Sequence, residues 1–497
     1  MTFIARGSGN GFPSAQSIAE IRDQINTLSR QLSTGKRAST ISELGVDLSR
    51  SIDLRSRLSR LSVYDESIAT TNTNFEAIIN SIKSFSDVSS QIEVHTLSPA
   101  TTPDSTNRNT IKTDLRRQFS QLVDYLNMEI GNRYLFGGKQ TESAPVMDSN
   151  LILDGSNGKA GLTQYIAERQ AADLGANGQG RLQTGSSSTL VTLSETVPNG
   201  LFGFTIKSVL SKSAGITAHS PSGTPPQAGF SVTSQPTAGE TLVVTLVLPD
   251  GTTTDVTLTA SGGADSHPFV IGTTLAETAT NISTALQSAL SATGKVELAA
   301  ASAKAAAADF FKGSTTNPPR RVAGPPYDTA TGFVAGTANN TVLWYQGTDD
   351  ANDPRNDNVT KISDRLAIGF GARATEPGFM STLAGAAMLA VTSFSTTDES
   401  LAKQQFSEMR DRARSFFSQS KADVVATSVS VMNSQKIAKT NSDDHKAQKS
   451  VFETALADVE NVPLDQTAVS LTSVQTQLQA LYQLTAKLQS LSLANYL

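Results

Sequence analysis

The four histidines are the first candidates for chemistry, because an imidazole can ligate a metal ion or act as a general base. No two of them have the spacing of metal ligands, and none lies in a His-Glu-x-x-His pattern. We therefore predict no metal site and expect the two histidines in helical segments to lie on solvated polar faces. The four are His95, His219, His267 and His445, of which the first and last belong to the helical segments.

Other motifs of catalytic and ligand-binding sites are missing from the sequence. The glycine clusters at Gly7–Gly11, Gly175–Gly180 and Gly369–Gly371 form neither a Walker loop nor a dinucleotide fingerprint, and there is no Gly-x-Ser-x-Gly elbow. The acidic run Asp349–Asp353 lacks the position-12 glutamate of a calcium loop and predicts a solvated turn. With no cysteine there is no thiolate chemistry. We predict that the protein is not an enzyme and binds no cofactor.

The N-terminal part has two rows of apolar residues at heptad spacing. The first contains Ile18, Ile21, Ile25, Leu28 and Leu32, and the turn Thr34–Arg37 follows it, with Gly35 as a helix end. A second helix is expected over about residues 44–97, with a row formed by Leu54, Leu61, Ile68, Phe75 and Ile82. A third helix, with Asp104 as its candidate cap, is expected to extend to Ile130. A heptad row of this length predicts a partner helix.

The C-terminal part repeats this pattern. A helix is expected from about Thr396 to Asn461, with a heptad row of Val424, Val431, Ala438 and Phe452 in which His445 fills the gap. Pro463 interrupts it. The last helix has an apolar row at steps of three and four residues, which contains Leu471, Val474, Leu478, Leu481 and Leu488, and Leu491 follows.

The middle of the chain holds most of the glycine and proline, and it is expected to be β-rich with short helices. Glu240–Leu248 and Thr252–Ala260 flank a Pro-Asp-Gly turn and predict a hairpin. A helix from Leu275 is expected to end at Gly294, and the Arg320–Arg321 pair beside prolines is interpreted as part of a linker.

The predicted fold is mostly α with an inserted β-rich region. The N- and C-terminal helices pair as a coiled coil or helical bundle, and the α+β middle projects outward. The expected parts are an N-terminal inner helix (1–40), the two halves of a helical core domain (41–140 and 380–462), inserted outer domains (141–379, with a ββα-type module at about 228–315) and a C-terminal inner helix (463–497).

The apolar rows of the two terminal helices form the predicted assembly interface. A compact core cannot bury a narrow stripe at each end of the chain, so we expect the terminal helices to pair with each other and then with neighbouring subunits. The alternative is a monomeric bundle whose ends dock together. We expect the first and last ~35 residues to fold on assembly. The interface residues are Ile18, Ile21, Ile25, Leu28, Leu32, Leu471, Val474, Leu478, Leu481, Leu488 and Leu491.

Composition limits the possible partners. The net charge of the 497 residues is −5, with no basic stripe, which argues against nucleic acid and against an anionic membrane surface. No apolar run is long enough to span a membrane, and the first residues lack a secretory signal pattern. A chain without cysteine is suited to export in an unfolded state, because it cannot become cross-linked.

Three stretches resemble the flagellin and hook-associated family of the bacterial flagellum. Gln31–Arg37 (QLSTGKR) is similar to the family's break between its first two helices, and Asn132–Thr141 (NRYLFGGKQT) is similar to a segment of hook–filament junction proteins. Leu456–Leu497 resembles the family's ending, in which Val459–Val462 (VENV) precedes a Gln/Leu-rich last helix. The first residues, MTFIARGSGNGFPS, and the last, LANYL, depart from the flagellin pattern and favour a junction protein.

The resemblance implies a structural subunit of the extracellular flagellum, with both termini in an inner coiled coil. It implies export through the flagellar type III apparatus without a cleaved signal peptide, after a chaperone has bound the C-terminal helix. The implied partners are the hook-side junction protein and flagellin, in a polymer or ring. Flagellin itself is the alternative within the family. Two alternatives belong to other functional classes. The first is a surface adhesin or binding module displayed by the β-rich middle. The second is an enzyme, for which the sequence shows no acid–base or metal-binding set of residues.

Overall fold

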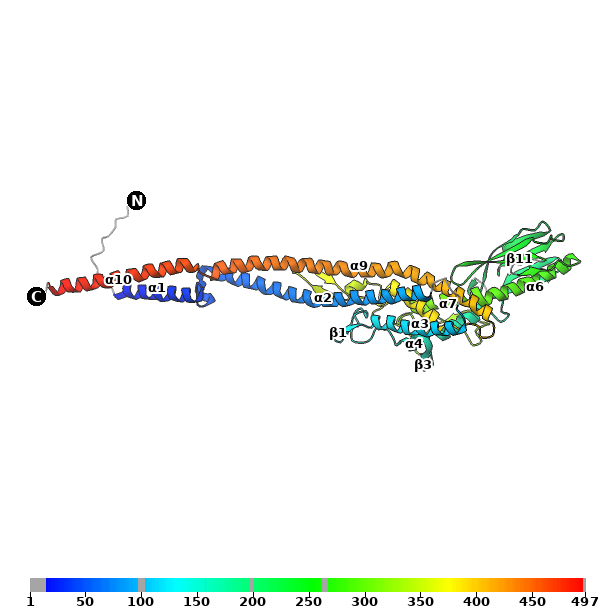
Figure 1. The fold of residues 1–497 in the computed structure, drawn as a ribbon, viewed down its shortest axis with the longest axis horizontal. Coiled ribbons are helices and arrows are strands. Elements are labelled where there is room, and N and C mark those ends of the chain that lie inside the picture. The colour runs from blue at the N-terminus through cyan, green and yellow to red at the C-terminus, as the bar shows by residue number, and fades with distance from the viewer. Residues whose placement is uncertain (1–14, 97–102, 157, 197–199, 262–266, 495–497) are drawn as a thin grey trace. The chain divides into compact units, whose positions relative to one another are not determined.

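The structure is a computed structural model that describes residues 15–96, 103–156, 158–196, 200–261 and 267–494 (Figure 1). The chain forms two compact units. Unit 1 contains Met1–Thr70, Lys361–Ala367 and Ile437–Leu497, and unit 2 contains Thr71–Thr360 and Ile368–Lys436. The long helices α2 (Leu48–Thr96) and α9 (Glu399–Glu460) contribute residues to both. The mostly helical fold with an inserted β-rich region is confirmed.

Unit 1 pairs the two ends of the chain. Helix α1 (Ala15–Thr34) packs on α10 (Leu464–Ala494), and the two lie side by side in Figure 1. The predicted break after α1 is confirmed, because Gly35 has a φ of 69°, a left-handed conformation that ends a helix. A 3-10 helix, η1 (Ile41–Asp47), leads into α2. The predicted interruption at Pro463 is also confirmed, since it falls between α9 and α10.

The heptad rows of α2 and α9 are buried as their periodicity predicts. On α2, Leu54, Leu61 and Ile68 in unit 1 and Phe75 and Ile82 in unit 2 are at most 8% exposed. On α9, Val424, Val431, Ala438 and His445 of the predicted row are buried, whereas Phe452 is only partly buried and Val459 is the next buried residue. Heptad spacing keeps a seam on one face of a helix, which is why the row could be identified from the sequence.

The helical core of unit 2 contains a helix that the periodicity did not indicate. Helix α8 (Pro377–Val391) is buried almost all round and packs on α3 (Ser105–Leu126). Its Phe379 ring meets Phe85 of α2 at 5.1 Å and Phe136 at 5.8 Å, both edge to face. These contacts make α8 the centre of the helical core.

The start of α3 agrees with the prediction, but its end does not. The Asp104 side chain caps α3 by accepting a 2.8 Å hydrogen bond from the Asn107 N–H. The helix ends at Leu126, and Ile130 lies in a two-residue strand instead of on the helix. Gly131 and Asn132 form the turn of that hairpin with positive φ angles, which a continuing helix does not allow.

Two four-stranded sheets and one helix form the outer module of unit 2. The strand orders are β5-β6-β9-β8 and β12-β11-β10-β7, and helix α6 (Leu275–Thr293) packs on strands of both. The predicted hairpin is confirmed as β10 and β11, paired from Thr241↔Thr259 to Val247↔Thr253. The strands are β5 (Leu182–Ser187), β6 (Leu190–Glu195), β7 (Thr205–Ser211), β8 (Ile216–Ser222), β9 (Gln227–Val232), β10 (Thr241–Val247), β11 (Thr253–Ala260) and β12 (Pro268–Phe269).

The predicted helix end at Gly294 is wrong. Gly294 has helical angles (φ −59°, ψ −42°), and the chain continues through a π-helical turn, η3 (Gly294–Leu298), into α7 (Ala299–Lys312). A Cβ at this position would lie 3.0 Å from the Leu174 side chain. The glycine therefore allows a close approach of α5 (Leu162–Leu174) rather than a turn of the backbone.

The remaining elements of the chain are short. They are β1 (Glu129–Ile130), β2 (Arg133–Tyr134), α4 (Ser149–Asp154), β3 (Gly155–Ser156), β4 (Lys159–Ala160), β13 (Arg321–Val322), β14 (Phe333–Val334), η4 (Pro354–Asp357), β15 (Val359–Lys361) and β16 (Ala367–Gly369).

Candidate assembly interface

The predicted interface residues lie along the contact between α1 and α10. On α1, Ile18, Ile21, Ile25, Leu28 and Leu32 are all partly buried. On α10, Val474 is buried, with 6% of its surface exposed. Leu471, Leu478, Leu481 and Leu488 are partly buried, and the side chain of Leu491 lies outside the described residues. The structure brings the described part of the predicted set to one pair of helices.

Half-burial of these side chains follows from the pairing of two helices. Among the described residues each apolar row packs on the other helix of the pair, so one flank of the row stays in contact with water. Further large apolar side chains on α10 are exposed, namely Val469 at 71%, Leu484 at 53% and Leu464 at 50%. In addition, α10 has no charged residue between Asp465 and Lys487. Helix α10 therefore presents a largely uncharged, partly apolar surface of the kind that another helix covers.

One polar contact fixes the register of the pair. The Arg22 guanidinium donates two hydrogen bonds to the Tyr482 hydroxyl, at 2.7 and 3.0 Å, and lies 5.8 Å from the ring centroid. Together with the bridge between Lys36 and Asn461, this contact shows that α1 and α10 are antiparallel.

The two breaks in the helices meet at the end of this pair, in a contact that we call the clamp. Its backbone part joins Gly35–Arg37 to Glu460–Val462. The Arg37 N–H donates to the Glu460 carbonyl at 2.7 Å, and the Val462 N–H donates to the Gly35 carbonyl at 3.0 Å. The Lys36 ammonium also donates to the Asn461 side chain at 2.8 Å. The sequence stretches before and after the β-rich middle are thus in direct contact.

Glu460 is the centre of the clamp. Its carboxylate accepts hydrogen bonds from Ser51 at 2.7 Å and from the Arg55 guanidinium at 2.7 and 2.8 Å, and the residue is only 7% exposed. The hydrogen bonds from Arg55 lower the pKa of Glu460 to about 2. The sequence did not single out Ser51 or Arg55. Both lie on α2 far from Glu460 in the chain, and a helix-surface arginine has no signature of its own.

The clamp should weaken in acid. Because the Glu460 pKa is lower folded than unfolded, its stabilisation is complete above the ordinary value of 4.5 and is lost as the pH falls toward 2. At pH 7, Glu460→Gln should destabilise the clamp by about 2 kcal/mol, because the charge-assisted bonds to Arg55 weaken. Amide exchange of Arg37 and Val462, compared with the wild type at each pH, measures this effect. Equal protection of both proteins at pH 7 would contradict the assignment.

The histidine expected on a solvated face of the last long helix is buried instead. His445 is 4% exposed, and its Nδ1 lies 3.1 Å from an Asp65 carboxylate oxygen on α2. The expectation for His445 was wrong because its heptad position, which places it in the seam, outweighs the acidic residues before it. His219 is exposed on β8, and the side chain of His95 lies outside the described residues. Among the described residues, no group of three or more His, Asp or Glu side chains is placed to hold a metal ion.

Two segments form ion pairs that the sequence did not indicate, although the acidic run Asp349–Asp353 is largely exposed, as predicted. Arg321 is buried and donates to the Glu168 carboxylate, so the Arg320–Arg321 segment is packed structure and not a linker. Within the acidic run, the Asp350 carboxylate accepts a 2.5 Å hydrogen bond from the Arg373 guanidinium. Arg373 also donates a hydrogen bond to Asp357. Because these partners are distant in sequence, local composition could not reveal them.

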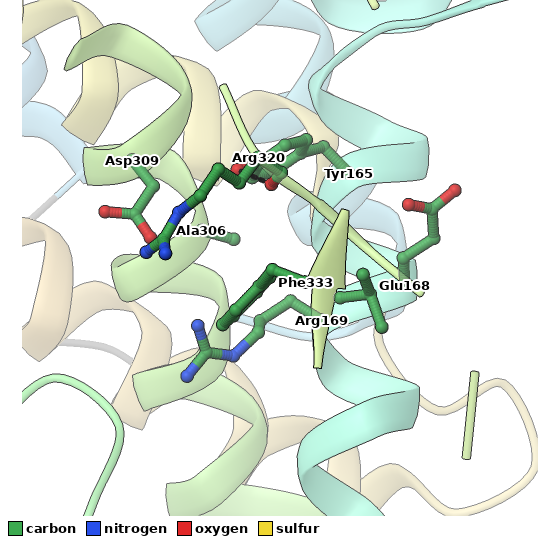
Figure 2. A pocket seen from close by; sticks show the side chains of 8 residues that line it. Tyr165, Glu168, Arg169, Ala306, Asp309, Arg320 and Phe333 are labelled. Atoms are coloured by element: carbon green, nitrogen blue, oxygen red, sulfur yellow. Dashed lines mark hydrogen bonds between the residues drawn. The ribbon is translucent and has the colours of Figure 1, made fainter. Parts of the chain in front are cut away.

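A small hollow of unit 2, lined in part by Arg169 and Arg320, has no room for a substrate. Figure 2 shows its lining, with the Phe333 ring between the side chains of Arg169 and Arg320. The two guanidinium carbons lie 5.4 and 5.0 Å from the ring centroid. The cavity encloses about 10 Å³, which is room for roughly one water molecule.

Comparisons with known proteins give little further information. No family model matches the chain, and no curated protein matches it. A crystal structure of flagellar hook-associated protein-3 from Legionella pneumophila is similar at 13% sequence identity and a TM-score of 0.19, over 84% of this chain and 100% of that chain. A TM-score this low does not establish a shared fold. In the described part of the chain, no helix combines the length and hydropathy that a membrane crossing requires.

Proposed function

We propose that the chain is a structural subunit of the bacterial flagellum and joins other subunits through the α1–α10 pair. The observation that carries this proposal is the half-buried seam of that pair, in which Val474 is the buried centre. In a monomer, two long apolar rows that cover each other only in part leave apolar surface in contact with water. In a polymer, helices of adjacent subunits cover that surface.

The clamp supports the same proposal. Two of the three stretches that resemble the flagellin and hook-associated family meet there, namely the end of Gln31–Arg37 and the segment around Val459–Val462. A sequence resemblance that falls on interacting residues is more informative than one spread over unrelated surfaces.

Within the flagellum, we propose that the chain stands at the junction between hook and filament, with flagellin as the alternative. Immunogold labelling of the protein on cells tests both. A single label at the distal end of the hook is expected for a junction protein, and labelling along the whole filament would favour flagellin. Absence of label from the flagellum would contradict the flagellar role itself.

Deletion of Ser470–Leu497 tests the assembly surface. The truncated chain should stay soluble but fail to join the flagellum, because α1 then has no helix to pair with. Trp344 is the only tryptophan, is fully buried and lies in unit 2, so its fluorescence reports whether unit 2 remains folded. Normal incorporation of a truncated chain whose unit 2 is folded would contradict the proposal.

A further inference from the structure

Glu195 is a buried carboxylate that joins the two sheets of the outer module. It is the last residue of β6 in one sheet and is 4% exposed. Its Oε1 accepts a 2.8 Å hydrogen bond from the backbone N–H of Ile206, which lies in β7 of the other sheet. The two sheets share one apolar core, to which Leu182, opposite Glu195 on β5, and Ile206 itself belong.

No cation among the described residues contacts this carboxylate. The Arg181 guanidinium, on the chain just before β5, donates to the carbonyl oxygens of Ala172 and Ala330. On β7 the charged residue is Lys207, which is exposed, and β9 has no titratable residue. On α6, Glu277 is exposed and accepts hydrogen bonds from Thr273.

Without a counter-ion, burial makes the charged form of Glu195 costly. Burial raises its pKa above the ordinary value of 4.5, and the hydrogen bond from Ile206 opposes this only in part. The folded module therefore binds a proton at a higher pH than the unfolded chain does. The stabilisation that this proton gives is complete below the ordinary value and is lost as the pH rises through the folded value.

We propose that Glu195 is an acid-responsive joint, which takes up one proton as the pH falls and then holds the two sheets together more tightly. A buried neutral carboxyl can still accept the Ile206 hydrogen bond, and it no longer carries an uncompensated charge in an apolar core. The outer module is thereby stabilised by mild acid, the opposite of the clamp around Glu460.

Amide exchange of the full chain, wild type against Glu195→Gln, tests the joint from pH 5 to pH 8. Comparing the two proteins at each pH cancels the chemical pH dependence of exchange. At pH 8 the amides of β6 and β7 should be at least about threefold better protected in Glu195→Gln, whose side chain is neutral at every pH. The difference should shrink as the pH falls.

The matched control is Asp255→Asn, which removes an exposed carboxylate from β11 of the same module. It should not change the protection of β6 and β7 in a pH-dependent way. Equal protection of wild type and Glu195→Gln at every pH, or a difference that grows toward acid, would overturn the proposal.

A second measurement does not depend on the variant folding. In the wild-type chain labelled with ¹³C at glutamate carboxyls, the assigned Glu195 resonance should titrate with a midpoint above the ordinary value of 4.5, as should that of Glu408, whose pKa burial also raises. If the assigned Glu195 carboxyl titrates at or below its ordinary value, Glu195 is not the joint that we propose.

Discussion

Replacing Val474 with aspartate should reduce incorporation of the protein into the flagellum at least tenfold. Val474 is a buried apolar residue of α10, the helix that packs on α1. An uncompensated carboxylate at this place costs several kcal/mol. We therefore expect α1 and α10 to separate, which removes the surface that adjacent subunits would cover. The amount of the protein in isolated flagella, in cells without a wild-type copy, is the measurement.

The neighbouring residue provides the control for this substitution. Gln475 is exposed on the same helix, so Gln475→Asp adds the same charge without placing it in the seam. Incorporation of the Gln475→Asp chain should stay close to that of the wild type. Equal losses in the two variants would mean that α10 tolerates no charge on any face, and normal incorporation of Val474→Asp would rule out the seam as the assembly surface.

Phe379→Ala should lower the free energy of unfolding of unit 2 by about 3–5 kcal/mol. Phe379 is fully buried at the start of α8 and makes edge-to-face contacts with Phe85 and Phe136. Its removal leaves a cavity at the point where α8, α2 and the segment after β2 meet. Denaturant unfolding followed by the fluorescence of Trp344, which lies in the same unit, measures the loss.

An exposed position on a helix of the same unit shows what an ordinary truncation costs. Val425 on α9 is 61% exposed, and Val425→Ala should change the free energy of unfolding by less than about 0.5 kcal/mol. If Phe379→Ala lowers the free energy of unfolding by less than about 1 kcal/mol, neighbouring side chains fill the cavity and α8 is not the centre of the core.

Helices with one buried face could be predicted from the sequence. Leu54, Leu61 and Ile68 repeat every seven residues because one side of α2 meets a partner, and their burial follows the row. The β10–β11 hairpin could also be predicted, since two segments with the residue pattern of strands flank a Pro-Asp-Gly turn. Such local patterns fix element type and the buried face.

Elements without a contrast between two faces could not be found in this way. Helix α8 is buried almost all round, and its alanines, glycines and threonine give no apolar period. The contacts of Glu460 with Ser51 and Arg55 join residues about 400 positions apart in the chain, and neither α2 side chain differs from an ordinary surface residue in sequence. Likewise, the role of Glu195 depends on Ile206 lying in a different sheet, which only the three-dimensional arrangement reveals.

The antiparallel meeting of the two helix breaks has a mechanical consequence. Gly35–Arg37 and Glu460–Val462 are hydrogen-bonded to each other. Tension applied to either end of the chain is therefore transmitted to both of these segments. The two chain segments then share the load, and the Arg55–Glu460 contact resists sliding of one segment along the other. Pulling one break away from the other must therefore disrupt these backbone and side-chain hydrogen bonds.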